Sequence, residues 1–204
     1  MNISEYYQPD FYHFCENTIK LADEASKLLS SMKDFPDVRV LDLCSGCGVV
    51  GMEILARLSR PVRVDFLELQ VEFNQYFKRN LSMFPKEYVS NMKLINGNFT
   101  DKNLLAEMKG RYDLVVSNPP FYLSDKARLG TNEKKNICRF FIRGLPPQFW
   151  EFCFMALKDD GNCLVLTKDD VDLCPPSNNF SWNVLDRYGD HLLVLASVLD
   201  KNGC

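Results

Sequence analysis

The sequence of 204 residues contains no apolar run of the about eighteen residues that a membrane-spanning helix needs. Its first residues, MNISEYYQPDFYHF, lack the basic start and apolar stretch of a signal peptide. Internal repeats and low-complexity tracts are also missing. These absences, with 46% hydrophobic residues, favour a cytoplasmic globular protein with one substantial core.

Metal-binding patterns and an excess of positive charge are missing too. The eight cysteines include one Cys-x-x-Cys pair, Cys44 and Cys47, with no second pair near it. No metal site is therefore expected, and the cysteines are expected to be reduced thiols. The net charge is −3 and the isoelectric point is about 5.5. Proteins that coat themselves with nucleic acid usually have values above about 9, so only a local basic patch remains open.

Strand and helix patterns alternate along the chain. Apolar residues at helical spacing predict a helix over residues 15–33, and residues 38–58 predict a strand, a glycine turn and a helix. Further strands are expected over 62–68, 91–99, 112–117 and 162–168, and helices over 70–84, 101–110 and 147–161, the last ending at Gly161. Residues 180–200 predict two antiparallel strands. The pattern indicates an α/β fold with a doubly wound, mostly parallel seven-stranded sheet and a C-terminal antiparallel hairpin.

The loops after the first four strands are expected to share one rim, since ligands bind such sheets outside the carboxyl ends of the strands. In the first loop, Asp42 precedes Gly46 and Gly48. Glycines permit a tight turn and close approach of a ligand. A dinucleotide fingerprint would read G-x-G-x-x-G, whereas an acid placed before the glycines suits a cationic ligand better than a phosphate.

The next two loops carry groups that suit a nucleoside. Glu68 ends the second predicted strand, where a carboxylate can accept both hydroxyl groups of a ribose. Asn98 and Phe99 follow the third strand and fit the edge and face of a purine. The order of these groups on successive strand ends predicts a site for an adenosyl ligand.

With these motifs, residues 35–200 resemble the class I S-adenosylmethionine-dependent methyltransferases. The resemblance implies a Rossmann-like methyltransferase fold, S-adenosylmethionine as cofactor, and a single structural domain in which residues 1–34 form a helical segment and cofactor lid and residues 35–204 the methyltransferase domain. It places Asp42 and Gly46 near the amino-acid moiety, Glu68 on the ribose, and Asn98 and Phe99 around the adenine. The full set of implied cofactor contacts is Asp42, Ser45, Gly46, Gly48, Glu68, Leu69, Asn98, Phe99 and Asn118.

The fourth predicted strand ends in Asn118-Pro119-Pro120-Phe121, because two prolines cannot donate to a sheet ladder. An Asn-Pro turn is also an ordinary strand breaker. The stretch resembles the Asn-Pro-Pro-aromatic motif of methyltransferases that act on planar amide-like or aryl amino nitrogens. The Asn118 side-chain oxygen and the Pro119 carbonyl can each accept one N–H, and Phe121 can stack on the substrate plane. These four residues are the predicted catalytic set.

Two flanking segments resemble bacterial tRNA adenine-N6 methyltransferases that act on the anticodon loop of valine tRNA. NEKKNICRFF resembles their N-E-K-x-x-x-A-R stretch, with Cys138 in the Ala position. In the N-terminal segment the matching residues are Gln8, Tyr12, His13, Phe14 and Thr18, whereas Asn17 stands where that family has Asp. His13 is expected to pack or to line the lid, and His191 to be structural.

Residues 125–143 form a predicted basic loop with a local charge of +4, on which phosphates of a looped RNA can dock. A solvated loop rich in Lys and Arg is the alternative. The predicted substrate contacts are Phe121, Tyr122, Lys134, Lys135 and Arg139.

The sequence therefore supports the hypothesis of an enzyme that methylates the exocyclic amino group of an adenine in RNA, with tRNA as the leading candidate and a monomer as the default state. Protein glutamine methylation of the release-factor type is one alternative, although those enzymes carry a helical N-terminal domain for which little room is expected here. A small-molecule N-methyltransferase and a non-catalytic RNA- or protein-binding module with the same fold are the others.

Overall fold

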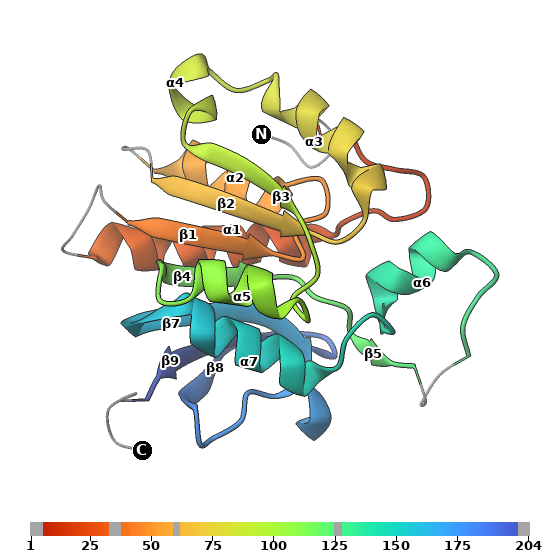
Figure 1. Cartoon of the computed structure of the whole chain (residues 1–204), viewed down its shortest axis with the longest axis vertical. Helices are drawn as coiled ribbons and strands as arrows, with labels where there is room; N and C mark the ends of the chain where they lie inside the picture. The colour runs from red at the N-terminus through yellow and green to blue at the C-terminus, as the bar shows by residue number, and fades with distance from the viewer. Residues whose placement is uncertain (1–5, 33–37, 59–61, 125–127, 200–204) are drawn as a thin grey trace.

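A seven-stranded sheet runs through the computed structural model, which describes residues 6–32, 38–58, 62–124 and 128–199. The strand order is β3-β2-β1-β4-β7-β9-β8, and β9 runs antiparallel to both of its neighbours (Figure 1). The predicted mostly parallel sheet with a C-terminal hairpin is therefore confirmed. The strands of this sheet are β1 (Arg39–Leu43), β2 (Arg63–Glu68), β3 (Met92–Asn96), β4 (Tyr112–Ser117), β7 (Leu157–Lys168), β8 (Phe180–Tyr188) and β9 (His191–Val198).

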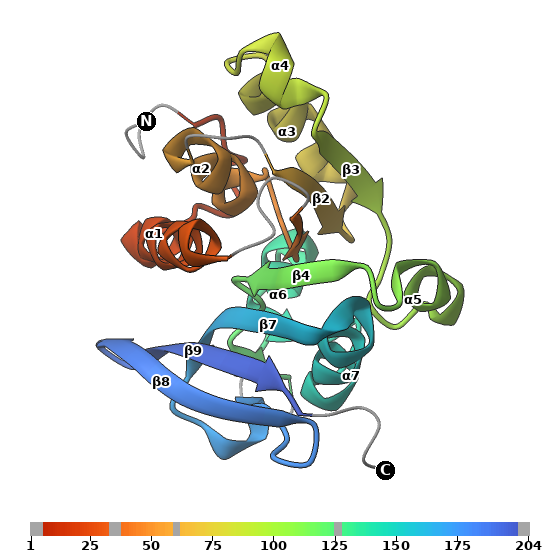
Figure 2. The same cartoon turned by 90° about the vertical axis from the view of Figure 1, so that its left-hand side faces the viewer.

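Helices cover both faces of the sheet (Figure 2). One face packs against α1 (Glu16–Ser31), α2 (Val49–Arg57) and α3 (Asn74–Leu81), which follows the short helix η2 (Val71–Phe73). The other face packs against α5 (Lys102–Met108) and α7 (Pro146–Ala156). The remaining elements are α4 (Lys86–Val89), α6 (Glu133–Arg139), η3 (Val171–Leu173), and a separate two-stranded sheet of β5 (Tyr122–Leu123) and β6 (Phe140–Phe141).

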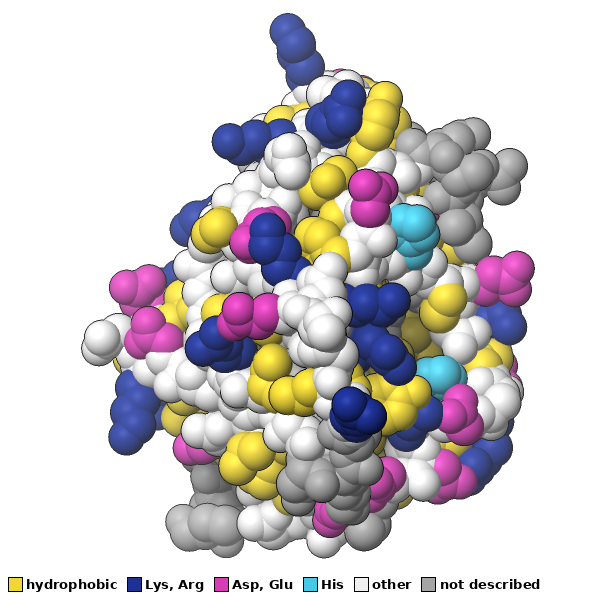
Figure 3. Space-filling view, turned by 90° about the vertical axis from the view of Figure 1, so that its right-hand side faces the viewer, with side chains coloured by type: hydrophobic (Ala, Val, Ile, Leu, Met, Phe, Trp, Pro, Cys, Tyr) yellow, Lys and Arg dark blue, Asp and Glu magenta, His cyan; other side chains and the backbone are white. Residues whose placement is uncertain are grey.

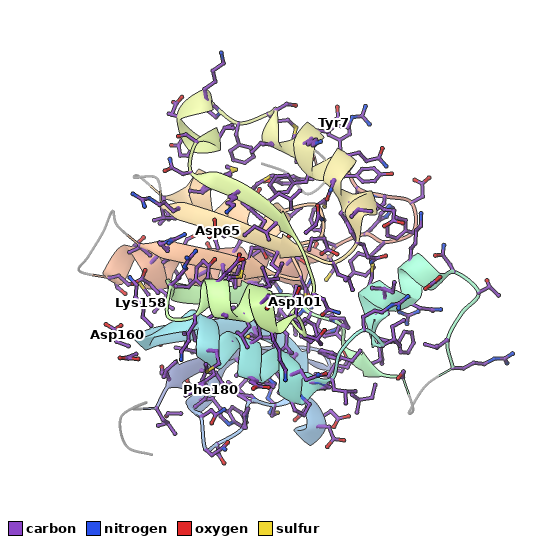
Figure 4. The ribbon with its side chains drawn as sticks, viewed as in Figure 1. Tyr7, Asp65, Asp101, Lys158, Asp160 and Phe180 are labelled. Carbon is purple, nitrogen blue, oxygen red and sulfur yellow. The ribbon has the colours of Figure 1, made fainter. Side chains whose placement is uncertain are left out.

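The alternation of side chains along the central strands divides the core into two layers. In β1, Val40 packs into the layer of α1 and α2, whereas Leu41 and Leu43 pack into the layer of α7. The α7 layer includes the edge-to-face pair of Trp150 and Phe180, of which Phe180 is labelled in Figure 4. Because both faces are covered, the sheet leaves its strand ends as the places where a ligand can reach the chain.

Local signals explain where several elements begin. Asp101 is the N-cap of α5, and its carboxylate accepts the backbone N–H groups of Asn103 and Leu104 (Figure 4). The helix predicted over residues 15–33 is α1, whose buried residues include Leu21 and Leu29. Helix α1 shares its core layer with α2, while the predicted domain boundary at residues 34 and 35 lies outside the described residues.

The predicted helix over residues 147–161 is wrong at its C-terminal end. Helix α7 ends at Ala156 and β7 begins at Leu157, so Gly161 lies within the strand. The last carbonyl groups of the helix, those of Met155 and Ala156, accept the backbone N–H groups of residues 110 and 111. These bonds to the segment before β4 satisfy the helix terminus and let the chain turn directly into the sheet.

The predicted basic loop over residues 125–143 is also wrong in part, because it contains α6 and β6. Asn132 caps α6 by accepting the N–H of Lys135, and the Asn136 side chain bonds both backbone groups of Gly130. Strand β6 pairs with β5, which directly follows the Asn118–Phe121 motif. Lys134, Lys135 and Arg139 are thus carried by a helix that is tied to the motif, while residues 125–127 lie outside the described residues.

Two further observations concern the described residues only. None of their helices has the length and apolarity required to cross a membrane. Their seven cysteines are free thiols, and no cluster of three or more potential metal-ligating side chains occurs among them.

Gly51 of α2 provides a test of how closely this helix packs on β2. A Cβ at Gly51 would lie 2.4 Å from the Phe66 ring. Gly51→Ala is expected to destabilise the protein by about 1–3 kcal/mol through overpacking, which outweighs the roughly 0.5–1 kcal/mol gained in helix propensity. Urea unfolding measures the change. Gly130→Ala is the matched control, because its Cβ would meet no atom closer than 3.5 Å, and equal stability of Gly51→Ala and the parent would contradict the packing argument.

Candidate active site

A cleft lies at the carboxyl ends of β1 to β4, where sheets of this kind bind their ligands. Figure 3 views the molecule from this side, where Lys and Arg side chains lie next to a small hollow among hydrophobic side chains. The α6–β6 segment and its continuation to Gly144 form one wall of the cleft. Of the predicted site residues, those that line it are Gly46, Glu68, Leu69, Asn98, Phe99, Asn118 and Pro120.

The turn after β1 uses three residues in the left-handed region of the backbone: Cys44, Gly46 and Gly48. Gly46 lines the cleft, as predicted. Gly48 does not line the cleft, and a Cβ there would lie 2.6 Å from the Phe77 ring of α3. Gly48 is therefore required for the close packing of the turn against α3, which is a different reason from the ligand approach predicted from the sequence.

Glu68 joins this turn to the end of β2. Its two carboxylate oxygens accept the backbone N–H groups of Gly46 and Gln70, each at 2.8 Å. Burial raises the pKa of Glu68, and the hydrogen bonds from Gln70 and Gly46 act in the opposite direction. The carboxylate is thus fixed in place at the cleft wall, and each oxygen retains lone-pair capacity for a ligand hydroxyl.

Asp42 lies behind the turn, on the face of β1 that meets α2. One carboxylate oxygen accepts the N–H of Gly51 at 2.9 Å, and the other is buried without a hydrogen-bond partner among the described residues. Burial raises the pKa of Asp42 well above its usual range, and the nearby Glu68 raises it further. A buried acid in this state gains from a positive charge brought close to it.

A smaller cavity adjoins the cleft through Gly46 and Asn118. The Ser45 hydroxyl lies at this cavity and is buried without a partner among the described residues. Ser45 provides a polar group for a ligand with hydrogen-bonding atoms, whereas Asp42 lines neither the cleft nor this cavity and can act on such a ligand only through its charge. The Ser45 hydroxyl at the cavity and the acid of Asp42 behind the turn fit the amino-acid end of S-adenosylmethionine, which carries both charge and hydrogen-bonding atoms.

The side chain of Asn98 bridges the cleft instead of remaining open to a ligand. Its amide nitrogen donates to the carbonyl of Arg143 at 2.7 Å, and its oxygen accepts the N–H of Thr100 at 3.1 Å. Phe99 packs edge-to-face on Phe149, and a Cβ at Gly144 would lie 2.4 Å from the Phe99 ring. Both predicted residues form the wall, and their bonds hold the segment around Gly144 against β3.

Asn118 lies where the cleft and the smaller cavity meet. Its side-chain nitrogen donates to the Thr18 hydroxyl at 3.0 Å, which orients the amide. Its side-chain oxygen is buried without a partner among the described residues. A hydrogen bond from the backbone N–H of Phe121 to the carbonyl of Arg139 then ties the motif to α6.

A third cavity lies on the outer side of the motif, against α6. Of the predicted substrate contacts, Phe121, Tyr122, Lys135 and Arg139 line it, and the Arg139 guanidinium lies 5.4 Å from the centre of the Tyr122 ring. Lys134 does not line it, because its ammonium group pairs with Glu72 of η2 at 3.1 Å. The sequence predicted that both lysines contact the substrate, whereas of the two only Lys135 faces the cavity.

Several lining residues were not in the predicted site. Tyr12 lines all three cavities, and Thr18 orients Asn118; both belong to the N-terminal pattern that was quoted above for its resemblance. Gln70 and Cys138 face the cleft from opposite walls and are hydrogen-bonded at 3.1 Å. The position of Gln70 two residues after Glu68 was the available signal, whereas the contact between these walls depends on the fold.

Solved structures of methyltransferases share this fold. A putative methyltransferase, yhhF, of Escherichia coli superposes with a TM-score of 0.62, at 19% identity, over 96% of this chain and 92% of that one. TrmN from Thermus thermophilus superposes with a TM-score of 0.59, at 18% identity, over 88% of this chain and 49% of that one. At these identities the likeness defines the class of fold, a Rossmann-like methyltransferase.

The family follows from the sequence match. Residues 14–142 match the model of the methyltransferase small domain, and the chain belongs to that family. The family and the fold imply S-adenosylmethionine as the methyl donor.

Curated relatives differ in what their names say they methylate. A release factor glutamine methyltransferase of Corynebacterium glutamicum is 36% identical over 101 residues, which are 50% of this chain and 34% of that protein. A tRNA1(Val) (adenine(37)-N6)-methyltransferase of Escherichia coli O157:H7 is 29% identical over 85 residues, 41% of this chain and 33% of that protein. The chain thus spans about a third of the length of these relatives.

The buried carboxyl group of Asp42 is expected to lower the stability of the protein at neutral pH and to strengthen ligand binding. A carboxyl whose pKa is raised in the folded state stabilises the protein at low pH, and this contribution is lost as the pH rises through the raised pKa. Asp42→Asn is therefore expected to raise the melting temperature at neutral pH. Each kcal/mol of unfolding free energy regained corresponds to on the order of 2–4 °C. The gain should shrink in acid, and S-adenosylmethionine should bind more weakly. Calorimetry at several pH values tests both effects, and a lower melting temperature at neutral pH would contradict the argument.

Proposed function

We propose that the chain is an S-adenosylmethionine-dependent N-methyltransferase that methylates the exocyclic amino group of an adenine in RNA, with tRNA as the first RNA to test. The observation that carries the proposal is the side-chain oxygen of Asn118 at the junction of the cavities, which is buried and has no hydrogen-bond partner among the residues that the structure describes. A buried acceptor without a partner costs free energy, which is regained when a ligand N–H binds to it.

The proposed chemistry follows from the orientation of this amide. An adenine amino nitrogen is a poor nucleophile, since its lone pair is conjugated with the ring. Asn118 accepts one of its N–H groups and the Pro119 carbonyl accepts the other, which favours a pyramidal nitrogen with a reactive lone pair. Thr18 supports this role because its hydroxyl binds the amide nitrogen and leaves the oxygen for the substrate. S-adenosylmethionine, when bound, supplies an electrophilic methyl group on a positively charged sulfur.

The remaining predicted residues are proposed to hold the two ligands. Asp42, Ser45, Gly46, Glu68 and Leu69 would hold the cofactor, with the walls at Asn98 and Phe99 enclosing its adenine. Phe121 and Tyr122 provide flat surfaces for the acceptor base beside the cations Lys135 and Arg139. The segment before α1 is proposed to act as a cofactor lid, because Tyr12 lines the cleft and both neighbouring cavities.

Protein glutamine methylation is the second candidate, and the observation in its favour is the 36% identity to a release factor glutamine methyltransferase. A glutamine side-chain amide needs the same two acceptors. We favour RNA because Lys135 and Arg139 line the cavity beside the motif, where they can neutralise phosphates that a glutamine peptide lacks. Incubation with labelled S-adenosylmethionine and either total RNA or total protein distinguishes the two candidates.

Asn118→Ala is expected to lower kcat about a hundredfold or more, because the loss of one such acceptor costs roughly 2.5–4 kcal/mol of barrier. The affinity for S-adenosylmethionine should stay within about tenfold of the parent value. Steady-state kinetics and calorimetry measure the two quantities. A parental turnover in Asn118→Ala would show that the motif is only a turn.

Thr18→Val is expected to lower kcat in the same direction, since the amide loses the partner that orients it. Thr18→Ser keeps the hydroxyl and is the matched control, with activity close to that of the parent. Identical losses in the two variants would mean that Thr18 contributes packing and not orientation.

The neighbouring lysines of α6 offer a matched pair for RNA binding. Lys135 lines the cavity, whereas Lys134 pairs with Glu72. Lys135→Ala is expected to weaken RNA binding and to reduce its salt dependence by about one unit of slope. Lys134→Ala removes an exposed ion pair, which is worth about 0–1 kcal/mol, and should change RNA affinity less. Filter binding at several salt concentrations measures both effects. Equal effects of the two variants would mean that Lys135 is an ordinary solvated surface residue and not a specific RNA contact.

A further inference from the structure

His191, which follows the β8–β9 turn as the first residue of β9, contacts the aromatic residue of the motif, although it lies beyond the family-matched residues 14–142. The His191 ring meets the Phe121 ring edge-to-face, with 4.6 Å between centroids and 72° between planes. Phe121 lines the cavity beside the motif and His191 does not. His191 therefore supports the Phe121 ring from outside the cavity, at the place where the proposed acceptor base stacks.

Two charged residues hold His191 in this position. One carboxylate oxygen of Asp190 lies 3.0 Å from the His191 Nδ1, and the other pairs with the Lys168 ammonium group at the end of β7. Lys168 also lies 4.5 Å from the centre of the Tyr122 ring. The hydrogen bond from Lys168 keeps the pKa of Asp190 below its usual range, so the carboxylate is ionised at neutral pH. The network thus contacts both aromatic rings that follow the two prolines.

The turn itself is fixed to the end of β7. His191 is the register partner of Lys168 in the antiparallel pair of β7 and β9. Arg187 pairs with Asp169 at 2.7 Å, and the backbone N–H of Asp169 donates to the carbonyl of Asp190 at 3.4 Å. These contacts on both sides of the turn leave His191 little freedom to move away from Phe121.

We propose that the β8–β9 turn is a specificity element for the methyl acceptor, in which His191, held by Asp190, fixes the plane of the Phe121 ring against which the flat acceptor stacks. The inference rests on the proposed function. His191 is a positioning residue that acts through Phe121. Lys168, Asp190 and His191 lie outside the family-matched residues, and they act on the acceptor side of the motif and not on the cofactor cleft.

The test separates acceptor binding from turnover. His191→Ala is expected to raise the apparent KM for total RNA roughly two- to tenfold, the range of an aromatic pair worth about 0.5–1.5 kcal/mol. The kcat and the affinity for S-adenosylmethionine should stay within about twofold. His191→Phe retains a ring edge against Phe121 and should restore the KM. Asn183→Ala, an exposed change on β8, is the control and should match the parent in every readout.

Each outcome decides the proposal. If the parent methylates RNA and His191→Ala has the parental KM, the inference fails while the proposed function stands. If His191→Phe does not restore the KM, or if the affinity for S-adenosylmethionine falls together with the melting temperature, the role is structural and the inference also fails. A parent that transfers no methyl group to total RNA overturns the proposed function and this inference with it. Should His191→Ala not fold, Asp190→Ala takes its place with the same readouts and the same expected rise in KM.

Discussion

The two hydrogen bonds that Glu68 accepts from the backbone N–H groups of Gly46 and Gln70 are the constraint on which the site depends. They join the turn after β1 to the end of β2, so that the first two strand ends form one rigid corner. The cleft is built on this corner, and its opposite wall, the α6–β6 segment, reaches it through the contact of Gln70 with Cys138. A side chain at this position that accepted neither bond would leave two backbone groups unpaired and the corner unfixed.

Several buried polar groups of the site lower the stability of the folded protein as long as no ligand is bound. Asp42, Ser45 and Asn118 each retain a buried polar atom without a partner among the described residues, and the pKa of Asp42 is raised. Such atoms would be satisfied in a protein shaped only for stability. Ser45 and Asn118 line the same cavity and Asp42 lies behind its turn, which indicates that the fold holds polar groups ready for a ligand and lowers the cost of ordering them during binding.

The sequence predicts the elements whose signals are local. The glycine turn after β1, the end of β4 at two prolines and the C-terminal hairpin all appear where residue types alone predict them. The sequence does not predict the end of α7 at Ala156, because that end is set by the distant residues 110 and 111. It also does not predict the direction of Lys134, which depends on the pitch of α6 and the position of Glu72. The contacts of Thr18 with Asn118 and of His191 with Phe121 carry no local signal either, because tertiary folding alone brings them together.

The bond between Thr18 and Asn118 joins residues 100 positions apart, and this separation has a consequence for the order in which the site matures. Contacts of high sequence separation form late, since a long loop must close before they stabilise the chain. The corner of Gly46 and Glu68 closes over only 22 positions, so it can form earlier during synthesis. A nascent chain can thus form its cofactor corner well before the Asn118 amide is oriented, and catalytic activity would then require that α1 has docked against the end of β4.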